Sequence, residues 1–199
     1  MTISNHDMSV LDTSTKKVLT DLFAKPNFLE QVPGTFGPGA VGTYMEPRTY
    51  RGELNGHIIN EIHVDLTGLA NAGTDTYAIG LSAGGYCYIG RHTLATHGIV
   101  YRIEMIWVET PTQATDTYTL DIDLRAEDGA DISYGEVADD SVLAAGGSVG
   151  IGKTYIDNVP ALTTNDYFYL AEGDSAGTTG KYGGGQVIIR MFGHQALTA

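Results

Sequence analysis

The stretch GSVGIGKT, residues 147–154, matches the phosphate-binding template G-x-x-x-x-G-K-[ST] at each constrained position. A working phosphate loop follows a buried strand and opens a helix, whose N-terminus meets the phosphates. Here Asp139 and Asp140 lie shortly before the glycines, and Pro160 would end any helix after about five residues. No later strand ends in an aspartate that would hold magnesium. We therefore expect a flexible turn, followed by a strand from about Lys153, and no nucleotide site.

A second chemical pattern is the nucleophile elbow G-x-S-x-G, which Gly80, Ser82 and Gly84 satisfy. Asp157 and His194 follow it in the order that many hydrolases use. The elbow needs a helix directly after its serine, whereas the following GYCYIGRHT pattern predicts a strand. We expect Ser82 to lie in a hairpin turn, and hydrolysis through Ser82 is the weakest of three functional hypotheses.

Acidic side chains gather in DIDLRAEDGAD, residues 121–131, which raises the question of calcium. A calcium loop that began at Asp121 would need glycine and glutamate where this chain has Ala126 and Ile132. A weak calcium site in the turn that holds Glu127, Asp128 and Asp131 stays an open alternative to a solvated acidic turn. We expect no metal site, no cofactor and no catalytic residues.

The histidines and the single cysteine favour structural roles. Of six histidines only His92 and His97 are close in sequence, at a spacing that suits neither one face of a strand nor a zinc pair. Cys87 excludes an internal disulfide, indicates a reducing compartment, and is expected to be a small core residue.

Tyrosine is abundant, with 12 residues against one tryptophan. Strand alternation would place Tyr86 and Tyr88 on one face, and likewise Tyr167 and Tyr169. Such faces are core edges, subunit contacts or sugar-stacking platforms, and the sequence leaves these alternatives open.

Length and charge limit the class of protein. The 199 residues suit one domain, or one domain with an arm, and the formal net charge of −13 argues against nucleic acid as a partner. The N-terminus lacks the pattern of a secretory signal, and no apolar run is long enough to span a membrane. We expect a soluble protein made in the cytoplasm of its host, with no membrane partner.

The elements that would position these residues change character along the chain. Residues 13–25 carry apolar side chains at helical spacing and predict one short helix. Residues 26–47 are rich in proline and glycine and predict an extended arm that needs a neighbour to order it. We therefore divide the chain into residues 1–49, the helix and arm, and residues 50–199, a β-domain.

Strands dominate from about residue 57, where the hydrophobic period changes to two. In residues 117–125 we expect Ile122 and Leu124 to point inward, and Asp121 and Asp123 to face solvent. Residues 98–109 are apolar enough for a central strand, and shorter strands are predicted at residues 76–81, 86–91, 153–156, 167–170 and 186–192. With no helices between them, these strands predict an all-β antiparallel sandwich with a jelly-roll-like arrangement.

Five blocks of the sequence resemble a group of structural proteins encoded by tailed bacteriophages, many from marine and aquatic hosts. The blocks are EIHVDLTGLA, YAIGLSAGGYCYIGRHT, GIVYRIEMIWVE, VPALTTNDYFYLAEG and KYGGGQVIIRMFGH. The resemblance covers about residues 57 to 194 and carries no functional residue across. It implies a jelly-roll-like virion protein that decorates or cements the head, binds the major capsid protein from outside, and assembles as a homo-oligomer, with a trimer favoured.

Our first hypothesis is therefore a non-enzymatic structural protein of the virion, located on the capsid surface, with residues 1–49 as its anchor. The alternative is a receptor- or glycan-binding module of a phage tail fibre, because exposed tyrosines on a β-scaffold can stack on sugars.

Overall fold

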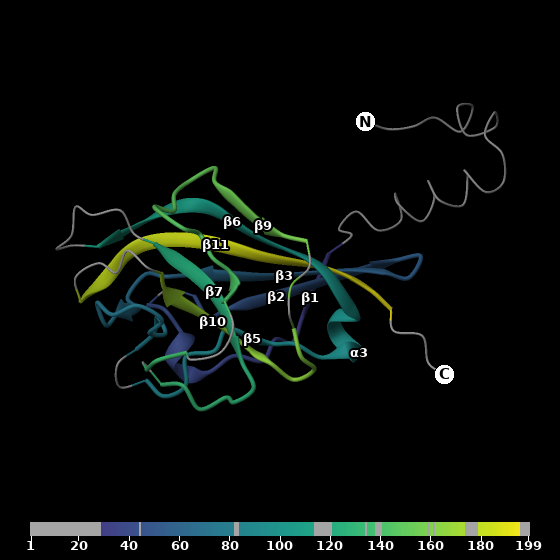
Figure 1. Cartoon of the computed structure of the whole chain (residues 1–199), viewed down its shortest axis with the longest axis horizontal. Coiled ribbons are helices and arrows are strands. Elements are labelled where there is room, and N and C mark those ends of the chain that lie inside the picture. The colour runs from purple at the N-terminus through teal and green to yellow at the C-terminus, as the bar shows by residue number, and fades with distance from the viewer. Residues whose placement is uncertain are drawn as a thin grey trace.

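The computed structural model describes residues 29–43, 45–81, 84–113, 121–133, 135–137, 141–158, 160, 162–173 and 179–195. Within these residues, two antiparallel sheets lie face to face and form a sandwich, with one short α-helix, α3 (Leu94–His97), at one end and a 3-10 helix, η1 (Pro38–Ala40), earlier in the chain (Figure 1). The all-β prediction is confirmed. The helix predicted at residues 13–25 lies outside the described residues.

The larger sheet contains seven strands and the smaller sheet four. The larger sheet runs in the order β1 (Glu30–Val32), β2 (Arg48–Leu54), β3 (His57–Asp65), β11 (Gly180–His194), β6 (Ile99–Gln113), β9 (Thr154–Asp157), and β4 (Ala70–Asn71) pairs with β11. The smaller sheet runs in the order β5 (Gly90–Arg91), β10 (Tyr167–Glu172), β7 (Ile122–Glu127), β8 (Ser141–Leu143). From β3 onward the chain passes back and forth between the sheets, except for β4, which stays beside β11, and for the β7–β8 pair.

The main core lies between the sheets, where alternate residues of both sheets meet. Trp107 on β6 is the largest of these side chains, and Phe168 on β10 is fully buried. The prediction that Ile122 and Leu124 point inward is confirmed, since both are 0% exposed. Of residues 98–109, all but Gly98 lie within β6, which is flanked by β11 and β9, so the central strand is also confirmed.

The solvent-facing prediction for Asp121 and Asp123 is wrong, because both are buried. β7 begins at Ile122, and Asp123 lies on the face of the small sheet that the chain's own segments cover. Its Oδ1 accepts a hydrogen bond of 2.7 Å from the backbone N–H of Ala145, so the carboxylate fixes the segment after β8. A strand pattern shows which residues share a face, but not whether that face meets water.

The described part of the predicted arm belongs to the sandwich itself. Residues 30–32 add β1 to the edge of the large sheet, and the expected boundary at residue 49 falls inside β2. Further along, Gly39 donates a 2.7 Å hydrogen bond to the carbonyl of Tyr86. A Cβ on Gly39 would lie 2.3 Å from the carbonyl oxygen of Gly85, so only glycine permits this approach. The neighbour that orders residues 29–49 is their own domain.

Several strand boundaries also differ from the sequence prediction. The glycine-rich tract at residues 180–185, which precedes the strand predicted at residues 186–192, forms the first part of β11 and carries two of its irregularities in register. Residues 76–81 form isolated bridges rather than a strand, and only Gly90 and Arg91 of residues 86–91 form one. The hydrophobic pattern did not predict β2. Asn55 and Gly56, with φ of 53° and 78°, form the turn between β2 and β3, and an Asn-Gly pair is a sequence signal for such a hairpin.

Candidate functional site

The glycine-rich template at residues 147–154 forms a turn between β8 and β9. Lys153 donates to the carbonyl of Ser148, and the Tyr155 hydroxyl donates to the same oxygen at 3.2 Å. The strand predicted from about Lys153 is β9, and it pairs with β6 where a phosphate loop would begin its helix. Lys153, the residue that would contact a phosphate in a phosphate loop, instead hydrogen-bonds within its own turn.

The residues of the elbow pattern do not converge. Ser82 lies outside the described residues, but Gly80 bridges to Ala70, which pairs with Lys181 near the start of β11. His194 is the last residue of β11, thirteen positions further on, or roughly 40 Å of strand at about 3.3 Å per residue. The chain after Gly84 continues without a helix into β5. The structure therefore separates the elbow from the histidine that followed it in sequence.

The acidic turn after β7 does not concentrate metal ligands. Within the described residues, which include Glu127, Asp128 and Asp131, no group of three or more His, Cys, Asp or Glu side chains is arranged to hold a metal ion.

His92 and His97, which are close in sequence, meet in the interior with ring centroids 5.5 Å apart, and each is 3% exposed. The backbone N–H of Thr93 donates to Nδ1 of His97 at 3.2 Å, so that nitrogen is unprotonated and Nε2 carries the proton. Burial, and then the neighbouring His92, lower the pKa of His97 to about 4. His97 is therefore a neutral, structural histidine near pH 7.

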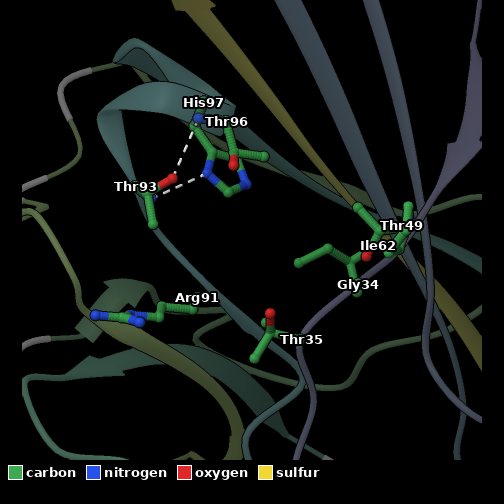
Figure 2. Close-up of a pocket in the computed structure, with 10 residues that line it drawn as sticks. Gly34, Thr35, Thr49, Ile62, Arg91, Thr93, Thr96 and His97 are labelled. Atoms are coloured by element: carbon green, nitrogen blue, oxygen red, sulfur yellow. Dashed lines mark hydrogen bonds between the residues drawn. The ribbon is translucent and has the colours of Figure 1, made fainter.

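A small cavity of about 120 Å³ opens beside His97 (Figure 2). The lining comes from the arm, from β2 and β3, and from the continuous stretch of β5 through α3. It consists of Pro33, Gly34, Thr35, Thr49, Ile62, Gly90, Arg91, Thr93, Thr96 and His97. These ten residues include no carboxylate, and in Figure 2 the guanidinium of Arg91 extends away from the other lining side chains.

The tyrosine faces separate into a buried group and an exposed residue. Tyr169 is 0% exposed and donates a 2.9 Å hydrogen bond to the carbonyl of Gly129, and burial raises the pKa of its hydroxyl. The Tyr88 ring packs edge-on against Tyr167 at 4.9 Å and Tyr169 at 6.4 Å. Tyr86 is instead 48% exposed. Three of the four tyrosines thus form the packing on the outer side of the small sheet.

The outer face of the large sheet carries a row of side chains across five neighbouring strands. Strand registers place Tyr50, Glu61, Arg190, Glu104 and Ile156 side by side from β2 to β9. Arg190 bridges the two carboxylates, at 2.6 Å from Glu61 and 3.5 Å from Glu104. We call these five residues the central row. Their inward neighbours belong to the main core, so the row points away from it.

Flanking side chains complete the charge balance of the central row. His63 lies 2.8 Å from the second oxygen of Glu61, and Arg102 pairs with Glu104. The hydrogen bond from His63 and the interactions with Arg190 outweigh burial and lower the pKa of Glu61. The Glu61 carboxylate is thus held ionised beneath partly exposed cationic groups, and Glu104 pairs with both Arg102 and Arg190.

Exposed apolar side chains accompany this row. Of eight large hydrophobic residues that are exposed in the described part of the chain, six lie on the large sheet or on the turn before its edge strand. They are Leu54, Ile99, Tyr101, Val108, Ile151 and Ile156. Sequence alternation alone did not predict this surface, because five strands, β2, β3, β11, β6 and β9, form it together. Within single strands, only the charged residues of β3, β6 and β11 pointed to it.

Comparisons with protein-family models, with curated proteins and with solved structures give no match to this chain. Within the described residues, no helix is both long and apolar enough to cross a membrane.

Proposed function

We propose that this chain is a non-enzymatic structural protein of a bacteriophage virion, which binds the outside of the capsid through the outer face of its large sheet. The observation that carries the proposal is the unequal covering of the two sheets. The chain covers the small sheet with its own segments, whereas the central row and the exposed apolar side chains around it face outward. A broad face of paired charges with interspersed apolar groups suits a protein partner, here the major capsid protein.

We also propose that the sandwich is a jelly roll. The support is its strand order, in which β3, β11, β6 and β9 are four neighbouring strands of the larger sheet and β5, β10, β7 and β8 form the smaller sheet. Eight strands that alternate between two sheets in this manner are the pattern of a jelly roll. The resemblance of five sequence blocks to phage structural proteins supports the same fold, location on the virion, and homo-oligomeric assembly, with a trimer favoured.

The anchoring segment in this proposal is shorter than residues 1–49. Residues 29–49 hydrogen-bond to their own sandwich and supply β1 and the first two residues of β2. Deleting them would damage the fold, so a deletion that tests anchoring has to end at residue 28.

The test measures binding of the purified chain to capsids that lack their decoration protein. We expect Ile156→Asp, which places a charge on an exposed apolar position of the central row, to weaken binding at least tenfold. Tyr86→Asp is the matched control, because Tyr86 is equally exposed, at 48%, but lies on the segment that covers the small sheet. Equal binding by the wild type and both variants would overturn the role of the large sheet.

A second variant, lacking residues 1–28, tests whether attachment depends on the large-sheet face or on the N-terminal segment. Loss of binding in this variant alone would assign attachment to that segment. Failure of the wild-type chain to bind capsids, together with saturable binding to a glycan array, would favour the receptor-binding alternative.

A further inference from the structure

Two histidines that are far apart in sequence face each other at the ends of two inner strands of the large sheet. His57 is the first residue of β3 and His194 the last of β11, and the strand register places them directly opposite each other. Their ring centroids are 4.6 Å apart with an interplanar angle of 55°, and both side chains are exposed. The pair therefore presents two imidazoles to solvent from two neighbouring strands.

The other histidines of the described chain are already engaged. Nδ1 of His92 lies 3.0 Å from the carbonyl of Thr163, and His97 is buried. Nε2 of His63 contacts Glu61. For His57 and His194, the described residues provide ring contacts but no hydrogen-bond partner for either imidazole. Their nitrogens are thus accessible for a ligand.

The spacing of the two rings fits a shared metal ion. With a nitrogen–metal distance of about 2.1 Å, the centroid of an imidazole lies about 3.2 Å from the metal. Two such centroids are about 4.5 Å apart for a right angle at the metal and about 5.2 Å apart for a tetrahedral angle. The observed 4.6 Å lies within this interval.

We propose that His57 and His194 bind one divalent transition-metal ion of the class that prefers imidazole, with Zn²⁺ as the representative ion. The described residues contain no group of three metal-binding side chains, so water completes the coordination and the ion exchanges readily. Ca²⁺ and Mg²⁺ do not fit, because they prefer oxygen ligands. Tyr101 stacks on His194 at 4.7 Å and 26°, and so holds that ring in position.

A metal at this position would cross-link the start of β3 to the end of β11. Because a ligand that binds only the folded chain stabilises it, Zn²⁺ should raise the melting temperature.

The test titrates the full-length chain with Zn²⁺ by calorimetry at pH 7.5. We expect one ion per chain, and at least a tenfold loss of affinity in His57→Ala and in His194→Ala. His63→Ala is the matched control, because His63 lies on the same outer face but contacts Glu61, and its affinity for Zn²⁺ should equal that of the wild type. Melting curves without metal verify that each variant folds.

Electron paramagnetic resonance with Cu²⁺ gives an independent measure of the ligands. We expect hyperfine coupling from two imidazole nitrogens in the wild type and from one in His57→Ala. Unchanged Zn²⁺ affinity in the His57→Ala, His194→Ala double variant would overturn the proposal. An equal loss of affinity in His63→Ala would also overturn it.

Discussion

The outer faces of the two sheets differ in whether other segments of the chain cover them. On the small sheet, Tyr169 and Ala171 of β10 point away from the main core, and a second buried cluster forms over them from Ala78, Cys87 and Val137. On the large sheet, Glu61, Arg190 and Glu104 occupy the equivalent outward positions and pair with one another. One face is thus a second, smaller core, and the other presents its ion pairs outward.

The physical reason for this difference lies in the outward side chains. Aromatic and small apolar residues gain free energy when a segment of the chain covers them, because apolar area leaves water. Charged residues lose hydration when they are covered, and so favour a face that is left open. The prediction of Cys87 as a small core residue is confirmed by this arrangement, since its side chain is 0% exposed within the second cluster.

The largest expected effect comes from removing a side chain of the covered face. Tyr169→Ala should lower the free energy of unfolding by about 3 to 5 kcal/mol, because it leaves a cavity and an unpaired carbonyl at Gly129. Phe192→Ala on the large sheet should cost only about 1 kcal/mol, since Phe192 is partly exposed. Urea denaturation measures both values. Equal losses would show that the two outer faces are energetically alike.

An intermediate effect should come from His97, which lies inside the sandwich and belongs to neither outer face. Its pKa falls from 6.5 to about 4 on folding, so the unfolded chain binds the proton more tightly. The contribution of His97 to the free energy of unfolding is fully present above pH 6.5 and is lost as the pH falls toward 4. At 1.36 kcal/mol per pKa unit, the loss by pH 4.5 is about 2 to 3 kcal/mol.

Denaturation of the wild type and of His97→Gln at pH 7.5 and pH 4.5 measures this contribution. We expect the difference between the two pH values to be smaller in the variant by that amount. Parallel pH profiles would mean that His97 titrates alike in the folded and unfolded chains.

The smallest effect is expected on the outer face of the large sheet. Glu61→Gln should cost about 1 kcal/mol at neutral pH, because Arg190 and His63 lose a carboxylate partner. The pKa of Glu61 is lowered from 4.5, so its contribution is present above pH 4.5 and is lost as pH falls below that value. Urea denaturation at pH 7 and pH 3 should therefore show a difference between wild type and variant that shrinks with acid.

The control for this prediction is Glu53→Gln. Glu53 pairs with Arg51, but both side chains are more than 30% exposed, so little stability should be lost. If Glu53→Gln cost as much as Glu61→Gln, the central row would be no more than an ordinary set of surface ion pairs.

The sequence predicted the fold class where each strand carries its own alternating pattern. Ile122 and Leu124 point inward as expected, and β9, β10 and the later part of β11 appear where their apolar runs predicted them. The failures involve residues whose surroundings are set by distant segments. Asp123 is buried by the segment near Ala145, and the glycines at the start of β11 become a strand because they pair with β4 and β6.

The candidate sites also differ in whether they depend on a local sequence pattern or on contacts between distant segments. The template at Gly147 matched a local pattern, but phosphate binding depends on a helix that the chain does not form there. The pair of His57 and His194 had no local signal at all, because 137 positions separate the two residues in the sequence and only the β3–β11 register joins them.

The sequence by itself determined that this chain forms an acidic, disulfide-free β-sandwich, because alternation, turn residues and charge are local or additive properties. Tertiary structure decided which outer face is covered, where residues 29–49 pack, and which histidines meet. These outcomes depend on strand pairing between distant segments, and the free energy of such pairing belongs to both partners rather than to either stretch of sequence.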